Sequence, residues 1–394
     1  MSAFLVNGVV LDTSNAGFEE RLAEAYAGRR RPRCLCNGAR PEMYVARLGD
    51  GHVAKRMPFT GSLHAPGCPS YEPPPEISGL GPLSNAIQED PGSGTTLLRL
   101  GFRMSRREAH PVAVSIDDGD GSVAASDARL TMRGLLHYLW TDAGLARWHP
   151  GFAGRRTWAI VRKHLLDAAL GKFVGGRALA DWLYLPEVFS VAEREPINSR
   201  RAARWAAVQP RAFALLIGEL KEVSPARFGY KAIVKHMPDI AFSVEEALFR
   251  RIEVRFESEL TLWATSEHVH MVMIATFALD DAGTPRIEEL SLMPVTSQWV
   301  PFRDRFELHL IAQLVRDDRR FTKTLRYDSK GDRAASAAVL LDTTPPCALH
   351  VIRRDADKDE AMPCYSEIDR IDCWHWEIAR GAMPNLPEPT GSPA

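Results

Sequence analysis

Four residues near the N-terminus have the types and the spacing of a metal site. Cys34 and Cys36 are separated by one residue, and His64 and Cys68 follow after a short interval. Thiolate and imidazole are ligands that zinc prefers, and four protein ligands leave no open position on a tetrahedral ion. The pattern therefore predicts a closed, structural zinc site made of these four residues. His52 is an alternative to His64, although its place in a predicted strand makes it the weaker choice.

The segment between the two ligand pairs predicts how they meet. Residues 43–48 and 52–57 have the pattern of two short strands on either side of the turn Gly49-Asp50-Gly51. A hairpin would bring the loop of the first ligand pair beside the loop of the second. A hairpin of this size buries too little apolar surface to be stable alone, so the metal would supply folding energy. We expect a zinc-ribbon-like module over residues 31–76.

Composition and charge limit the class of protein. The chain has 394 residues, of which 45% are hydrophobic and 25% are charged, as in soluble globular proteins. A net charge of -1 argues against a histone-like polycation, but Arg29, Arg30, Arg31 and Arg33 form a basic run beside the metal motif. No apolar run approaches about 18 residues and no signal-peptide pattern begins the chain, so we expect a cytoplasmic protein without membrane contact. In that compartment thiols are metal ligands more often than disulfides.

The order of motifs predicts an α+β fold. We expect a small zinc-ribbon-like N-terminal module, a central helical segment and a mixed or mainly antiparallel α/β body, because most connections are too short for regular βαβ units. The expected segments are an N-terminal lead (1–30), the zinc-binding hairpin module (31–76), a linker and irregular segment (77–125), a helical, helix-turn-helix-like segment (126–200), a mixed α/β domain (201–370) and a tail (371–394). The tail holds Trp374 and Trp376 and ends in proline-rich residues expected to lack regular structure.

Hydrophobic periodicity predicts the individual elements. Helices are expected over 18–27, from Thr131 as N-cap to Gly144, and over 155–170, 244–252 and 305–315. Strands are expected over 213–223, 259–264, 268–279, 287–295, 323–327, 338–341 and 348–352.

The two helices of the central segment resemble a helix-turn-helix in outline. The second helix would carry Arg155, Arg156, Arg162 and Lys163 on its polar side. A cationic helix can lie along the phosphates of DNA, so these residues are candidate nucleic-acid contacts together with the basic run from Arg29 to Arg33. An ordinary solvated helix face explains the same residues, and both interpretations stay open.

One pattern is compatible with an enzyme. Glu187 follows a proline, and Glu219 is followed two positions later by Lys221. Metal-dependent nucleases of the restriction type use two such acids to bind Mg²⁺ and a lysine to offset developing charge. In a regular strand Glu219 and Lys221 would share a face. An exposed polar strand face gives the same alternation, so the residues remain weak catalytic candidates.

Two further groups near the C-terminus are interpreted as structural. Basic residues at 319, 320, 323 and 326 lie near Glu307 and Asp342, and we expect a salt-bridged surface there, although these cations can also meet a phosphate backbone. Cys347, Cys364 and Cys373 lack paired spacing and are expected to be ordinary thiols whose role the sequence leaves open.

Several motifs together resemble an uncharacterised bacterial family. They are Cys34-x-Cys36, Arg40-Pro41, Lys55-Arg56-x-Pro58, His64-x-x-x-Cys68, the run from Gly134 to Trp140, and Arg320-Phe321-x-Lys323-x-Leu325-Arg326-Tyr327. The chain is similar over nearly its whole length to the domain-of-unknown-function family numbered eleven seventy-three, which is marked by three N-terminal cysteines. The resemblance implies a bacterial protein often carried on integrative conjugative elements and plasmids, and it supplies no activity. More loosely, the N-terminal module resembles the zinc-ribbon-like start of competence proteins that bear a nuclease domain.

The leading hypothesis is a zinc-binding, nucleic-acid-handling accessory protein of a mobile element, with zinc in a structural role. Its partners would be nucleic acid and other mobile-element proteins. A non-enzymatic interaction or scaffold protein is the first alternative, and a nuclease that also needs Mg²⁺ is the second.

Overall fold

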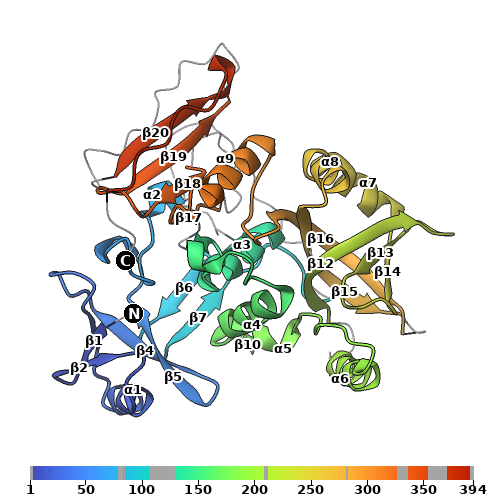
Figure 1. Ribbon diagram of the computed structural model, residues 1–394. Coiled ribbons are helices and arrows are strands. Elements are labelled where there is room, and N and C mark those ends of the chain that lie inside the picture. Colours follow the sequence, from blue (N-terminus) through green and yellow to red (C-terminus); the bar gives the residue numbers. More distant parts are fainter. Residues whose placement is uncertain are drawn as a thin grey trace, which may run out of the picture.

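The computed structural model describes most of the chain in detail. The described residues are 3–78, 83, 85–106, 129–207, 212–280, 283–325, 336–353 and 371–390. Figure 1 shows three groups of strands around a central set of helices, with the N-terminal module at the lower left and a barrel at the right.

The N-terminal module consists of small antiparallel sheets and one helix. Its elements are β1 (Ala3–Val6), β2 (Val9–Asp12), α1 (Phe18–Ala27), β3 (Arg33–Cys34), β4 (Met43–Leu48), β5 (Gly51–Arg56) and the 3₁₀ turn η1 (Gly61–Leu63). The short α2 (Pro75–Ser78) follows the module and buries Ile77 against Val339 and Ala348. Strand β1 lies between β2 and β3, while β4 and β5 form a separate hairpin. Helix α1 contacts this hairpin and buries Leu22 and Ala25. The predicted helix and hairpin are both confirmed.

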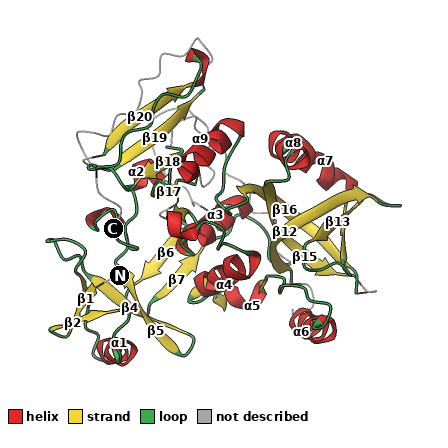
Figure 2. Cartoon of the chain, viewed as in Figure 1, coloured by secondary structure: helices red, strands yellow, loops and turns green. Residues whose placement is uncertain are grey.

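The central segment begins with β6 (Ile87–Asp90) and β7 (Thr95–Leu98), which join β9 (Lys172–Val174) and β10 (Arg177–Ala178) in one sheet. Around it lie α3 (Met132–Asp142), α4 (Trp158–Ala169) and the short α5 (Leu179–Trp182), as Figure 2 shows. Thr131 caps α3 as predicted, because its side chain accepts a hydrogen bond from the Gly134 amide.

The connection from α3 to α4 differs from a helix-turn-helix. It contains β8 (Arg147–Trp148) and a 3₁₀ turn, η3 (Pro150–Phe152), and β8 pairs with a strand of the C-terminal sheet. The short turn that positions a recognition helix is therefore replaced by a sheet contact. The helix-turn-helix expectation is wrong for this part of the chain.

The barrel contains five strands that close into a ring. They are β12 (Ala214–Pro225), β13 (Tyr230–Val234), β14 (Ala241–Val244), β15 (Val269–Leu279) and β16 (Pro285–Thr296). The order is β12-β13-β14-β16-β15, and β15 pairs again with β12. The short β11 (Leu183–Tyr184) runs beside β12, and α6 (Arg194–Ala206) follows β11. Two helices, α7 (Glu246–Arg255) and α8 (Glu257–Thr265), connect β14 to β15.

Helix α8 corrects one prediction, since residues 259–264 were expected to form a strand. Phe256, Leu260 and Trp263 recur with a helical spacing and pack on the barrel core. The Leu260 amide donates to the Phe256 carbonyl at 2.8 Å, as in a helical turn. A short apolar run does not distinguish a strand from a helix, and here packing on the barrel decided in favour of the helix.

The C-terminal sheet has the order β20-β19-β18-β17-β8. Its strands β17 (Phe321–Lys323), β18 (Ala338–Leu340), β19 (Cys347–Ile352) and β20 (Asp372–Glu377) are accompanied by α9 (Arg305–Arg316) and by η4 (Ile378–Arg380). The segment predicted as a tail thus supplies the edge strand β20, and Trp374 and Trp376 are buried in the core of this sheet. The chain remains packed as far as Thr390, whose amide donates to the Asp342 carbonyl at 2.9 Å.

Helices and mixed or antiparallel sheets are combined in one chain, so the α+β class is confirmed. No helix among the described residues is long and apolar enough to cross a membrane.

Candidate metal centre

The four predicted ligands are brought together by two loops of the N-terminal module. Cys34 ends β3, where it pairs with Phe4 of β1, and its amide donates to the Pro41 carbonyl at 2.9 Å. His64 follows η1 directly, and Cys68 lies in the next turn, where its amide donates to the Ala65 carbonyl at 2.8 Å. These backbone bonds help to position the ligand side chains.

The ligand atoms form one compact group. The Sγ atoms of Cys34 and Cys68 are 3.7 Å apart, and Nδ1 of His64 lies 3.5 Å from Cys36 Sγ and 3.7 Å from Cys68 Sγ. All four ligand atoms lie within 4.8 Å of one another. The group can hold a metal ion, and His64 rather than His52 belongs to it. The His52 ring instead packs against Tyr26.

Backbone amides point at two of the sulfur atoms. The Ala65 amide donates to Cys36 Sγ at 3.3 Å, and the Ser70 amide donates to Cys68 Sγ at 3.4 Å. Hydrogen bonds to a charged acceptor are stronger than those to a neutral one, so these amides favour the thiolate form that binds metals.

Burial disfavours the thiolate form of this group unless a cation offsets the charge. Cys34, His64 and Cys68 are almost completely buried. Burial raises the pKa of Cys34 to about 12, and it also raises the pKa of Cys68. Burial and the nearby Arg56 lower the pKa of His64, so its ring is neutral and can donate a lone pair. A divalent cation would offset the cost of burying thiolates, which couples metal binding to folding.

Arg147 of β8 fixes the loop that carries Cys68. Its guanidinium donates to the carbonyl oxygens of Cys68 at 2.6 Å, Pro69 at 2.8 Å, Pro66 at 3.2 Å and Tyr71 at 3.3 Å. Since β8 belongs to the C-terminal sheet, this single side chain ties the ligand loop to the body of the protein. Nothing in the local sequence indicates this role, because the contact joins residues far apart in the chain.

The basic run next to the metal group is exposed. Arg29, Arg30, Arg31 and Arg33 all lie at the surface. Arg31 and Arg33 share the carboxylate of Glu42 at 3.3 and 3.6 Å, in the exposed kind of ion pair that contributes little to stability. The run is therefore available to a partner.

The four basic candidates around α4 divide into two kinds. Arg155 and Lys163 are exposed. Arg156 is buried, donates to the carbonyls of Leu145 and Arg147, and has its pKa lowered by burial to about 10. The fourth, Arg162, donates to the Leu185 carbonyl at 3.1 Å. Two of these candidates thus have structural partners, which sequence periodicity did not indicate.

The two acidic catalytic candidates are each paired with other residues. Glu187 accepts two hydrogen bonds from Arg200, at 3.0 and 2.7 Å, which lower its pKa. The Glu219 carboxylate is bonded to Lys235 at 2.5 Å instead of to Lys221. Strand β12 has a register shift at the exposed Lys221, so regular alternation fails there. A Mg²⁺ ion at this place would have to compete with these cations.

Glu219 belongs to a cluster that the sequence did not reveal. Its buried carboxylate accepts a hydrogen bond from Nδ1 of His270 at 2.7 Å, and the His270 ring stacks on Trp299 with centroids 5.0 Å apart. Burial would raise the pKa of Glu219, but the bonds from His270 and Lys235 outweigh it and lower that pKa. The cluster joins β12 to β15 and to Lys235, the residue that follows β13, through charge and hydrogen bonding.

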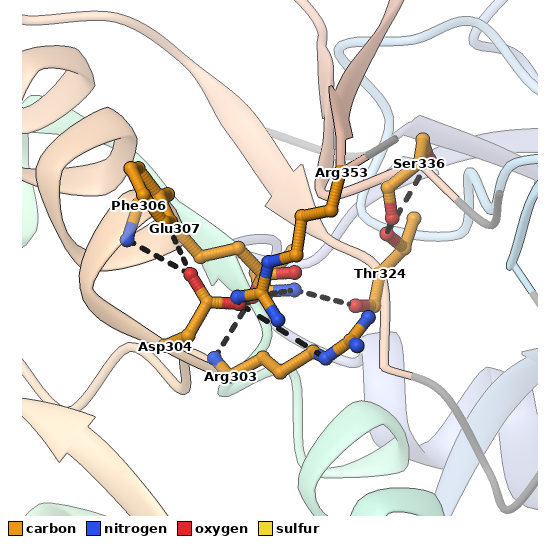
Figure 3. Close-up of polar contacts among 8 residues, drawn as sticks. Arg303, Asp304, Phe306, Glu307, Thr324, Ser336 and Arg353 are labelled. Carbon is orange, nitrogen blue, oxygen red and sulfur yellow. Dashed lines mark hydrogen bonds and ion pairs between the residues drawn. The ribbon is translucent and has the colours of Figure 1, made fainter. Parts of the chain in front are cut away.

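A second buried charge cluster lies where α9 meets the C-terminal sheet, and Figure 3 shows most of its members. Asp304 caps α9 by accepting from the amides of Phe306 and Glu307 at 2.8 and 3.1 Å. Lys323 Nζ lies 3.1 Å from Glu307, and Arg353 pairs with Asp304. The ion pairs agree with the structural interpretation of this region, but Glu307 and Lys323 are buried and do not form the salt-bridged surface that was expected.

The other predicted residues of this region are described only in part. Arg319 binds both carboxylate oxygens of Asp342, at 2.9 and 2.8 Å. Cys347 is buried and Cys373 half-buried, and neither forms a disulfide within the described part of the chain. Arg326 and Cys364 lie outside the described residues.

Fold and site together define an α+β protein with an N-terminal Cys₃His group able to hold a metal ion. A family model described as a protein of unknown function, DUF1173, matches residues 4–379. The chain therefore belongs to this family, as its motifs predicted. Neither a curated protein nor a solved structure matches the chain.

Proposed function

We propose that this protein is a zinc-stabilised, nucleic-acid-binding accessory protein. The observation that carries the proposal is the metal group itself, with an exposed run of arginines beside it. A reducing, cytoplasmic location belongs to the proposal, since free thiols serve as ligands there.

The separations within the group support zinc. A tetrahedral ion with bonds of about 2.3 Å to sulfur and about 2.05 Å to nitrogen has S···S edges of about 3.8 Å and S···N edges of about 3.6 Å. The corresponding separations are 3.7 Å between sulfurs and 3.5 and 3.7 Å from sulfur to nitrogen. Soft thiolates with one imidazole favour zinc over Mg²⁺ or Ca²⁺, which prefer oxygen ligands. Four protein ligands leave no position for a substrate, so the zinc is structural.

The distribution of charge supports a polyanionic partner. Arg29 and Arg30 directly precede the metal-binding loops and are exposed. A zinc-fixed loop would hold these cations at a defined place, where they can contact phosphates. Lys163 on α4 and Arg155 in the connection before α4 add exposed positive charge. The role on a mobile element rests on the family resemblance alone.

Binding to DNA over a series of salt concentrations tests the proposal. We expect log affinity to fall linearly with log salt, because phosphate contacts release counterions. Replacement of Arg29 and Arg30 by alanine should weaken binding and reduce that slope. The matched control is Arg316→Ala, which removes an exposed arginine from α9. Absence of binding at roughly 50 mM salt would contradict the proposal and favour an interaction or scaffold protein.

A further inference from the structure

The barrel has the strand order of a fold that recognises polymers. Strand β12 pairs with β15 along its first half, from Ala214 to Leu220, and with β13 along its second half, from Leu220 to Pro225. The pairing of β14 with β16 is parallel, and α7 and α8 are inserted between β14 and β15. This is the topology of the OB-fold, a five-stranded Greek-key barrel that binds oligonucleotides or oligosaccharides.

In that fold the ligand lies on the second and third strands and against the loops between strands one and two and between strands four and five. Here the two strands are β13 and β14, and the first of the two loops is the turn at residues 226–229. The β12–β13 hairpin projects from the right side of the barrel in Figure 1, away from the N-terminal module.

The tip of this hairpin presents an aromatic ring and a cation. Phe228 is 83% exposed, and the Arg227 guanidinium carbon lies 5.3 Å from the centre of its ring. The Ala226 amide donates to the Gly229 carbonyl at 3.0 Å, which closes the turn. Gly229 has φ +74° and passes so near the next strand that a Cβ would lie 2.5 Å from the Val244 carbonyl oxygen. The turn is therefore fixed while the ring faces solvent.

The outer face beside the tip carries further positive charge. Lys231 of β13 pairs across the sheet with Ser243, which in turn pairs with Arg286 of β16, so the three side chains share one row on one face. Lys231 and Arg286 are exposed. Arg286 contacts Glu288 at 2.7 Å, and Arg286 is solvent-exposed enough for a phosphate to compete with that carboxylate. Next to the tip, Tyr230, which pairs with Pro225, stacks on Phe249 of α7 with centroids 3.8 Å apart.

We infer that the barrel binds single-stranded nucleic acid, with Phe228 stacking on a base and Arg227 and Lys231 contacting adjacent phosphates. An aromatic platform next to a row of cations suits a chain that alternates bases with phosphates. A neutral oligosaccharide would leave the cations without a role. A duplex would hide its base faces from Phe228. The inference rests on the proposed function and adds to the arginine run a second contact surface, on which the nucleic acid is single-stranded.

Fluorescence anisotropy on the full-length protein tests this, with a labelled oligothymidine of about 15 nucleotides as the probe. Phe228→Ala should weaken binding about tenfold or more, the loss expected for one stacked base. Replacing both Arg227 and Lys231 by alanine should reduce the salt slope by about 1.4, since each phosphate contact on a single strand contributes about 0.7. The matched control Val191→Ala removes an apolar side chain that is 82% exposed in the loop before α6, and it should leave affinity unchanged.

The possible results distinguish failure of the barrel site from failure of the proposed function. Oligothymidine binding that is the same for the wild type and Phe228→Ala would overturn the barrel site but leave the proposed function standing. Binding to a duplex of the same length with equal affinity and equal sensitivity to Phe228→Ala would overturn the single-strand assignment. Binding to a neutral cello-oligosaccharide that Phe228→Ala abolishes would overturn the nucleic-acid assignment. If neither DNA form binds at low salt, both the inference and the proposed function fail.

Discussion

Replacing Arg147 by methionine removes the side chain that holds the Cys68 loop against the C-terminal sheet. Four carbonyl acceptors lose their donor, and the two shortest bonds, at 2.6 and 2.8 Å, go to Cys68 and Pro69. Hydrogen bonds to charged groups contribute about 1.5–3 kcal/mol each. Burial lowers the pKa of Arg147, so part of that gain offsets the cost of burying its charge.

We therefore expect Arg147→Met to lower the free energy of unfolding by about 2–4 kcal/mol. Zinc affinity should fall by about 10- to 100-fold, as is typical when a group that orients a metal ligand is lost. Arg147→Lys should give an intermediate result, because one ammonium cannot reach all four carbonyls.

Two measurements test this prediction. Competition with a chromophoric chelator gives the zinc affinity, and urea denaturation of the zinc-loaded protein gives the stability. Arg155→Met is the control, since Arg155 is an exposed arginine in the same connection. A zinc affinity within about twofold of the wild type, with a stability change below about 0.5 kcal/mol, would refute the role assigned to Arg147.

Three other predictions concern the body of the protein. The pKa of Glu219 is lowered by its partners, so its contribution to stability is present above the ordinary carboxyl pKa and is lost as pH falls through the lowered value. Glu219→Gln should thus flatten the acid side of a stability profile measured by urea denaturation from pH 7 to about pH 3, and an unchanged profile would argue against the pairing with His270. Thr131→Ala removes the α3 cap and should cost about 1 kcal/mol, whereas Thr131→Ser, which keeps the hydroxyl, should cost less than half of that. Lys172→Met removes the ammonium that lies 2.6 Å from the Asp142 carboxylate, whose pKa is lowered to about 2. The free energy of unfolding, measured by thermal denaturation, should fall by about 3–5 kcal/mol. An unchanged free energy of unfolding would contradict the assigned ion pair.

Local patterns in the sequence predicted local structure well. The spacing of Cys34, Cys36, His64 and Cys68 specified the metal group, because a tetrahedral ion needs few ligands and the intervening hairpin has clear turn residues. Thr131 and the apolar period after it likewise predicted α3 and its cap. In these cases the pattern that determines the element, a hairpin turn or a helix cap, lies within that element or directly beside it in the sequence.

The closed barrel and the long-range side-chain contacts could not be predicted from such local patterns. Its closure depends on one strand, β12, pairing with two partners, and on a parallel contact between β14 and β16 that lie on either side of two helices. The carbonyl contacts of Arg147 and the ion pair between Glu219 and Lys235 also arise only from tertiary structure. The exposed Phe228 can be interpreted as a candidate binding residue only once its position on the barrel is known.

The zinc content of purified protein and of the Cys34→Ser variant tests the central claim most directly. Cys34 is a buried member of the group, and serine preserves its size while removing the thiolate. Measured by inductively coupled plasma mass spectrometry after exhaustive dialysis, the wild type should retain about one zinc per chain and the variant well under half of that. A wild-type content below about half an equivalent, unchanged in Cys34→Ser, would contradict a structural zinc centre at these residues.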